Sequence, residues 1–290
     1  MVFEILAIMA PVVLIAGLGV VWTQRGKDFN TTLITNLVYY FGAPALVFST
    51  LSVIEFDAAL GNFALAAIAS FVGFAVLGAP ILLALKMPVR TYLSTLMFPN
   101  MGNMGLPICL FAFGDAGLVL AVIYFSVAAV AHYTIGVWLL SGERTPTRLF
   151  KTPLVYAAGA ALIFQGLGAT PPGWLANTAS LLGGMTIPLL LLTLGVSLAT
   201  TKVGHLVRGS RIAVLRLSIG FAVGWAISTA FGFTGVERGV VILDCTMPVA
   251  VFSYLLASRF DRAPEDVAGA IAVSTGLSVI TLPLILALVL

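Results

Sequence analysis

The polar residues best able to do chemistry lie close together in Phe98-Pro99-Asn100-Met101-Gly102-Asn103-Met104-Gly105-Leu106-Pro107. Its two prolines each remove a backbone donor, and its glycines weaken a helix. Breaking a helix here would free N–H groups that, with the positive end of the helix dipole, can hold a carboxylate. We therefore expect Asn100, Asn103, Gly105 and Pro107 to line an anion site. The alternative is a proline kink whose amides bond to neighbouring helices.

A second interrupted stretch, Leu243-Asp244-Cys245-Thr246-Met247-Pro248-Val249-Ala250, combines a carboxylate with a proline. Asp244 is the only acidic residue that we place inside the apolar part of the chain, where such a group is costly and is by default a functional hypothesis. Asp244 is either a proton acceptor or one member of a structural pair with Arg216. Thr246 and Pro248, which lie at the break, join the predicted binding residues.

Other candidates have plain structural alternatives. His132 could relay protons with Tyr133, although a lone histidine in an apolar bundle is more often hydrogen-bonded structure. Ser49 and Thr193 could bind a substrate carboxylate or hydroxyl, or could bond back to their own helices. Cys109 and Cys245 stand in apolar stretches without metal-ligand spacing, so we expect ordinary thiols and no metal site.

The composition decides which solvent surrounds these residues. Hydrophobic residues make up 60% of the 290 and charged residues 9%, and the mean hydropathy is +1.13. That balance leaves too little polar surface to coat a water-soluble globule, so most of the chain must face lipid. The net charge of +3 comes without a dense basic run, so we expect no nucleic-acid partner.

Ten apolar runs are long enough to be membrane spans, which predicts an all-α integral membrane protein. A polar connection at residues 141–152 divides them into two groups of five. The expected spans are residues 4–22, 32–53, 58–85, 91–113, 117–140, 153–168, 175–199, 211–232, 237–258 and 265–290.

Basic residues test this division, because Lys and Arg gather in cytoplasmic connections. Twelve of the fourteen fall in the odd-numbered connections. We therefore expect a multi-pass protein of a cell inner membrane with both termini outside. The twelve are Arg25, Lys27, Lys86, Arg90, Arg144, Arg148, Lys151, Lys202, Arg208, Arg211, Arg259 and Arg262.

An odd number of spans per half means that the two halves, residues 1–140 and 153–290, must have opposite orientations. Faint similarity between residues 43–51 and 187–195 supports an inverted repeat, since each places a proline mid-span and a hydroxyl five residues later. Inverted repeats with paired broken helices are typical of secondary transporters whose site lies at the repeat interface.

These motifs resemble the auxin efflux carrier family, which includes plant PIN-type carriers and bacterial dicarboxylate transporters. The resemblance rests on residues 100–107, Pro44, Thr186-Ile187-Pro188 and residues 244–248, and it runs the whole length without a long central loop, as in bacterial members. It implies a fold similar to that of the bile acid sodium symporters, with broken helices four and nine crossing. Helices 1, 2, 6 and 7 would form a scaffold and helices 3–5 and 8–10 a transport domain, in a homodimer.

Carried onto this chain, the crossover positions are Asn103, Pro107 and Pro248. Helix nine departs from the pattern because no asparagine there matches Asn103, and no second intramembrane carboxylate is present for a two-residue relay. We expect a secondary transporter of a small organic anion that works by an elevator mechanism, without a cofactor and with coupling to protons or sodium left open. A sodium-coupled symporter and a channel or receptor are the alternatives; an enzyme is not expected, since no paired carboxylates, His-rich cluster or Ser/Lys dyad lies in the spans.

Overall fold

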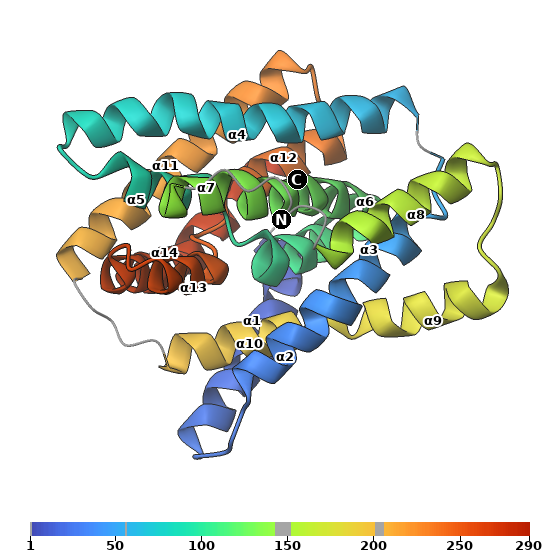
Figure 1. Ribbon diagram of the computed structural model, residues 1–290, viewed down its shortest axis with the longest axis horizontal. Coiled ribbons are helices and arrows are strands. Elements are labelled where there is room, and N and C mark those ends of the chain that lie inside the picture. The colour runs from blue at the N-terminus through green and yellow to red at the C-terminus, as the bar shows by residue number, and fades with distance from the viewer. Residues whose placement is uncertain (1, 56, 143–151, 201–205) are drawn as a thin grey trace.

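The computed structural model describes residues 2–55, 57–142, 152–200 and 206–290, and these residues form helices throughout (Figure 1). Arg144, Arg148, Lys151 and Lys202, which entered the topology prediction, lie outside the described residues. The elements of the first half are α1 (Val2–Gln24), α2 (Thr31–Leu37), η1 (Val38–Gly42), α3 (Ala43–Leu51), α4 (Ala58–Ala84), α5 (Val89–Met97), η2 (Met101–Gly105), α6 (Leu106–Ala131), η3 (His132–Gly136) and α7 (Val137–Ser141). Those of the second half are α8 (Pro153–Gly166), α9 (Gly173–Gly184), α10 (Thr186–Thr200), α11 (Leu206–Ala230), α12 (Gly235–Thr246), α13 (Val251–Arg259) and α14 (Pro264–Val289).

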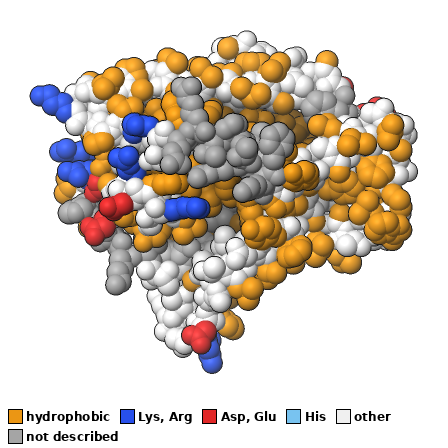
Figure 2. Space-filling view, in the orientation of Figure 1, with side chains coloured by type: hydrophobic (Ala, Val, Ile, Leu, Met, Phe, Trp, Pro, Cys, Tyr) orange, Lys and Arg blue, Asp and Glu red, His pale blue; other side chains and the backbone are white. Residues whose placement is uncertain are grey.

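Helices suited to lipid dominate the chain. Among the described residues, seven helical stretches are long and apolar enough to cross a membrane, and α8 is a shorter apolar helix. Figure 2 shows hydrophobic side chains over most of one face, with Lys and Arg gathered mainly at its left-hand side and lower tip. Large apolar side chains such as Leu14, Val76 and Leu284 are more than half exposed, as expected where lipid covers them. The chain is therefore a multi-pass membrane protein.

Breaks occur where the sequence predicts them. Helix α5 ends at Met97, and the chain passes through Pro99 before η2 begins. Helix α12 ends at Thr246, and the chain passes through Pro248 before α13 begins. Proline has no N–H to donate and its ring disfavours a helical residue before it, so each helix stops ahead of the proline.

One expected boundary takes a different form. The predicted spans 91–113 and 117–140 meet within α6, where two helical stretches join at a kink at the non-helical Gly114, inside the expected connection 114–116. Gly114 has φ of +65°, in the left-handed region that a side chain disfavours. The kink therefore lies at the boundary that hydropathy predicts.

Close helix contacts fix the arrangement around the breaks. Helix α1 lies against α10 where Gly19 and Gly195 face backbone atoms of the other helix, so that neither position has room for a Cβ. Helix α11 packs along both α12 and α14, and η2 packs against α10. Small residues at such crossings let helices approach closely enough for dispersion contacts to hold them in lipid.

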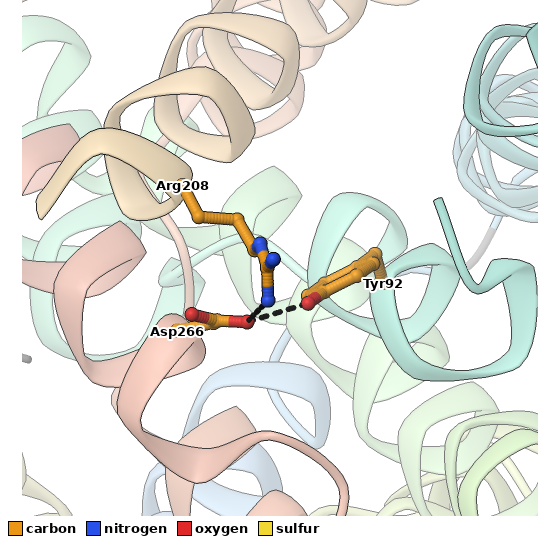
Figure 3. A network of polar contacts seen from close by, with 3 residues as sticks. All are labelled: Tyr92, Arg208 and Asp266. Atoms are coloured by element: carbon orange, nitrogen blue, oxygen red, sulfur yellow. Dashed lines mark hydrogen bonds and ion pairs between the residues drawn. The ribbon is translucent and has the colours of Figure 1, made fainter. Parts of the chain in front are cut away.

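A polar cluster joins residues near the starts of three helices (Figure 3). Asp266 of α14 is 2% exposed, and its Oδ2 accepts hydrogen bonds from the Tyr92 hydroxyl at 2.6 Å and from Arg208 at 3.1 Å. The carboxylate also stands in the first turn of α14, where the helix dipole favours negative charge. The cluster ties α5, α11 and α14 together. Nothing in the sequence pattern marked Tyr92 or Asp266 as members of such a cluster.

Candidate functional site

The two interrupted segments meet at the centre of the bundle. Pro99 and Val249 form an antiparallel bridge; Asn100 N–H donates to the Pro248 carbonyl at 2.8 Å, and Ala250 N–H donates to the Phe98 carbonyl at 3.2 Å. Residues 98–100 and 247–250 are all buried. Unwound backbone groups are costly in an apolar interior unless paired. Each broken helix therefore supplies hydrogen-bond partners for the other.

Four half-helix ends converge at this crossing. Helices α5 and α12 approach it with their C-terminal ends, whereas η2, continued by α6, and α13 leave it with their N-terminal ends. N-terminal ends carry positive partial charge and unpaired N–H groups, and C-terminal ends carry the opposite. The geometry can therefore hold an anion on one pair of ends and a cation on the other.

Asn100 is the predicted site residue most firmly built into the crossing. It is 4% exposed, its carbonyl accepts bonds from the N–H groups of Met104 and Gly105, and its side-chain Nδ2 has no hydrogen-bond partner among the described residues. Asn103 is half-buried in η2, and Pro107 is buried in the first turn of α6. The amide of Asn100 is thus an unused donor beside paired backbone.

Asp244 lies against Gly105, at the end of η2. It is fully buried, and its Oδ1 approaches Gly105 so closely that a Cβ on that glycine would overlap the carboxyl group. The same oxygen is 4.0 Å from the Cys109 thiol, and Oδ2 has no partner among the described residues. The structure therefore brings Asn100, Gly105 and Asp244 into one small region of the crossing.

Arg216 does not form the ion pair with Asp244 that was one of the two alternatives. It is fully buried on α11, and its guanidinium donates to the Leu96 carbonyl at 2.9 Å and to the Cys245 carbonyl at 2.7 Å. These described residues show no Arg216–Asp244 contact within ion-pair distance. Backbone carbonyls carry no signature in the sequence, so pattern reasoning could not find these partners.

His132 lies behind the crossing rather than in it. Its ring stacks on Phe98, with centroids 4.0 Å apart, and meets Phe252 edge-on at 5.1 Å. Its Nε2 has no hydrogen-bond partner among the described residues. Phe98 and Phe252, which flank the two breaks, were missed by sequence reasoning, although each stands within four residues of a predicted proline break.

The predicted hydroxyl residues all bond within their own helices. Thr246 donates to Ile242 at 2.7 Å, Thr193 to Leu189 at 2.7 Å, and Ser49 to Leu46 at 3.2 Å. Thr246 is buried at the crossing, whereas Ser49 lies beside Gly183 of α9. A hydroxyl that donates to its own helix still has lone pairs to offer, so a binding role for these residues stays a prediction.

The chain matches a family profile described as "Membrane transport protein" over residues 4–146 and 137–286. An uncharacterized transporter from Methanothermobacter thermautotrophicus is 30% identical over 191 residues, which are 64% of this chain and 63% of that relative. The matched region thus spans less than two thirds of that relative's length. An uncharacterized transporter from Methanocaldococcus jannaschii is 22% identical over 275 residues, which are 89% of each chain. The protein therefore belongs to this family of membrane transport proteins, and its resemblance to the auxin efflux carriers is confirmed.

Proposed function

We propose that the protein is a secondary active transporter that moves a small organic anion, a carboxylate or dicarboxylate, by an elevator-type alternating-access mechanism. The observation that carries the proposal is the crossing itself, where two unwound segments pair through Pro99 and Val249. Discontinuous helices that cross near the middle of a membrane form the substrate and ion sites of many secondary transporters.

The choice of an anion follows from the donors at the crossing. The N-terminal ends of η2 and α13 and the free amide of Asn100 all offer positive or donating groups. Asn103 and Gly105 stand in the same turn, and Thr246 and Pro248 stand on the opposite broken helix. A carboxylate can accept several such bonds at once, which offsets the loss of its hydration.

The proposed topology has ten membrane helices in two inverted repeats, residues 1–140 and 153–290. In this division the elements α5, η2 and α6 up to Gly114 make helix four, and α12 with α13 makes helix nine. Helices 1, 2, 6 and 7 form the scaffold and the others the moving transport domain. Both termini face outward from a cell inner membrane, and two chains form a homodimer.

Asp244 is the proposed coupling residue. A buried ionised carboxylate without a partner is costly, and the Asp244 Oδ2 atom has none among the described residues. A proton bound to Asp244 would neutralise the carboxylate while it is buried. Release of that proton would accompany exposure of the site to water. His132 is a second candidate through its unpaired Nε2. The proposal assigns no catalytic residue, metal or cofactor.

Counterflow into proteoliposomes tests the function directly. Protein-containing vesicles loaded with an unlabelled mono- or dicarboxylate should accumulate the same labelled anion transiently, with a rate that saturates. Empty vesicles, and vesicles loaded with a sugar of similar size, are the controls. Unsaturable flux at channel rates would favour a channel, and no accumulation across the whole carboxylate panel would overturn the proposal.

A further inference from the structure

Arg216 occupies a position that the proposed mechanism does not use. Its two hydrogen bonds run to carbonyls in the last turns of two different half-helices, Leu96 in α5 and Cys245 in α12. The carbonyls of a last turn have no partner within their own helix. One side chain therefore binds one carbonyl at each of the two C-terminal ends that meet at the crossing.

The charges match as well as the hydrogen bonds. Each helix C-terminus carries roughly half a negative elementary charge, so the two ends together present roughly one. The guanidinium supplies one positive charge with a planar fork that can reach two acceptors. The Arg216 guanidinium also lies over the Phe74 ring, with its central carbon 4.6 Å from the ring centroid. The fully buried cation is compensated without any acidic residue.

The helix that carries Arg216 is shaped for this contact. Gly220 and Gly224 follow it at four and eight residues, on the same helix face. A Cβ at Gly220 would overlap the Cys245 carbonyl oxygen, and one at Gly224 would meet Cys245 and Ile242 at 2.9 Å. The two glycines let the end of α12 lie directly on α11, and this closeness brings the Cys245 carbonyl within reach of Arg216.

In transporters built from broken helices, unwound carbonyls and half-helix C-terminal ends are the groups that coordinate a coupling cation. We propose that the Arg216 guanidinium is a built-in cation that replaces such an ion, by binding the C-terminal carbonyls of both broken helices at once. The inference rests on the proposed transport function. This role of Arg216 argues against the sodium-coupled alternative, because the carbonyls that would coordinate sodium are already bound to a permanent positive charge.

The first experiment needs no variant and no transported anion. Thermal unfolding of the purified protein is followed in sodium chloride and in choline chloride at equal ionic strength. The midpoint should be the same in both salts. A midpoint that rises with sodium along a saturation curve would overturn the proposal.

The second experiment removes the Arg216 charge by substitution and supplies a guanidinium group from solution. Arg216→Ala should unfold at a lower temperature, and millimolar methylguanidinium should recover part of the loss in this variant but not in the wild type. Arg216→Lys, which can satisfy one carbonyl, should fall between them and keeps the test available if the alanine variant does not fold. Arg211→Ala, at an exposed arginine five residues earlier on the same helix, should behave as the wild type with and without methylguanidinium. Unfolding of Arg216→Gln at the wild-type temperature would contradict the need for a cation.

The third experiment measures transport in the same two salts. Uptake by the wild type should be equal in sodium and choline, and a strict sodium requirement would overturn the inference. If no carboxylate is taken up at all, the proposed function fails, while the two unfolding experiments still decide the role of Arg216.

Discussion

Asn100 and Asn103 differ in how they are held at the crossing. The backbone of Asn100 is held by Pro248 and its side-chain amide is free, whereas Asn103 is half-buried and follows one turn later in η2. A side chain with partial exposure at an unwound turn can reach a ligand without first breaking contacts. Asn103 is therefore the residue at which a substitution tests the proposed anion site with least damage to the fold.

We expect Asn103→Ala to weaken anion binding about ten- to a hundredfold, because a hydrogen bond to a charged group contributes about 1.5–3 kcal/mol. Binding to the purified protein in detergent is the measurement. Asn177→Ala, at an exposed position of α9, is the matched control and should bind as the wild type. Unchanged affinity in a folded Asn103→Ala protein would remove this residue from the site.

Asp244→Asn should make uptake insensitive to an imposed pH gradient, because the amide keeps the size of the carboxyl group but cannot release a proton. The Cys109 thiol, whose Sγ is 4.0 Å from the Asp244 carboxyl group, is a neighbouring ionisable side chain. Asp115→Asn, an exposed carboxylate beside the bend at Gly114, should leave the pH response intact. Uptake by Asp244→Asn that still follows the pH gradient as in the wild type would exclude a proton role.

At the scale of elements, η2 and α12 come into close contact where Gly105 faces the Asp244 carboxyl group. Gly105→Ala would push its methyl group into the Asp244 carboxyl. Overpacking of this kind costs about 1–3 kcal/mol. We expect a lower unfolding temperature and weaker anion binding, with Gly17→Ala, which has open space around it, as the neutral control.

The same pair allows a double-mutant test. If the clash is the cause, Asp244→Ala should relieve much of the loss of stability in Gly105→Ala, so the double variant should be more stable than the sum of the single changes predicts. Additive losses of the two single variants would show that the two positions act separately.

Several elements were predictable because local chemistry determines them. Pro99 and Pro248 end α5 and α12 without reference to the rest of the chain. The pairing of residues 98–100 with 248–250 was beyond prediction from pattern, because it joins backbone groups about half the chain apart. The boundary at Gly114 was predicted from hydropathy, but its form was not, since a glycine in an apolar run marks a weak point but not the direction of a bend.

The site was predictable in part on the same grounds. Prolines, amides and a carboxylate are visible as departures from apolar composition, so the sequence marks Asn100, Gly105 and Asp244, which the structure places close together, while their roles stay predictions. Their partners are not marked, because Arg216 bonds to carbonyls and His132 stacks on rings. An ion pair between Arg216 and Asp244 was one of two alternatives for Asp244, and it is absent from the described residues because Arg216 donates to carbonyls at two helix ends instead.

At the scale of the whole molecule, the proposal requires the crossing to move against a scaffold that includes α10. Gly102 of η2 faces Leu190 of α10, and a Cβ added at Gly102 would lie 4.0 Å from the Leu190 Cδ1 atom. This contact joins the proposed moving and fixed parts. It also lies beside the site, so a link here would act where the motion occurs.

We expect a short crosslink between cysteines at Gly102→Cys and Leu190→Cys to stop transport while anion binding persists, in a background without Cys109 and Cys245. The matched pair Gly73→Cys and Val223→Cys joins α4 to α11 within the proposed transport domain, and its crosslink should leave transport largely intact. Full transport by quantitatively crosslinked Gly102–Leu190 protein would favour local gating over a moving domain.

The paired backbone at the crossing also governs how the protein can be made. The Phe98 carbonyl and the Asn100 N–H are among the earlier parts of the chain to leave the ribosome, yet their partners at Ala250 and Pro248 are synthesised about 150 residues later. Until then the broken end of the first segment has exposed polar groups that a bilayer does not satisfy. We therefore expect the nascent first half to remain at a watery surface or in a protein-lined passage until the second half is synthesised and completes its pairing.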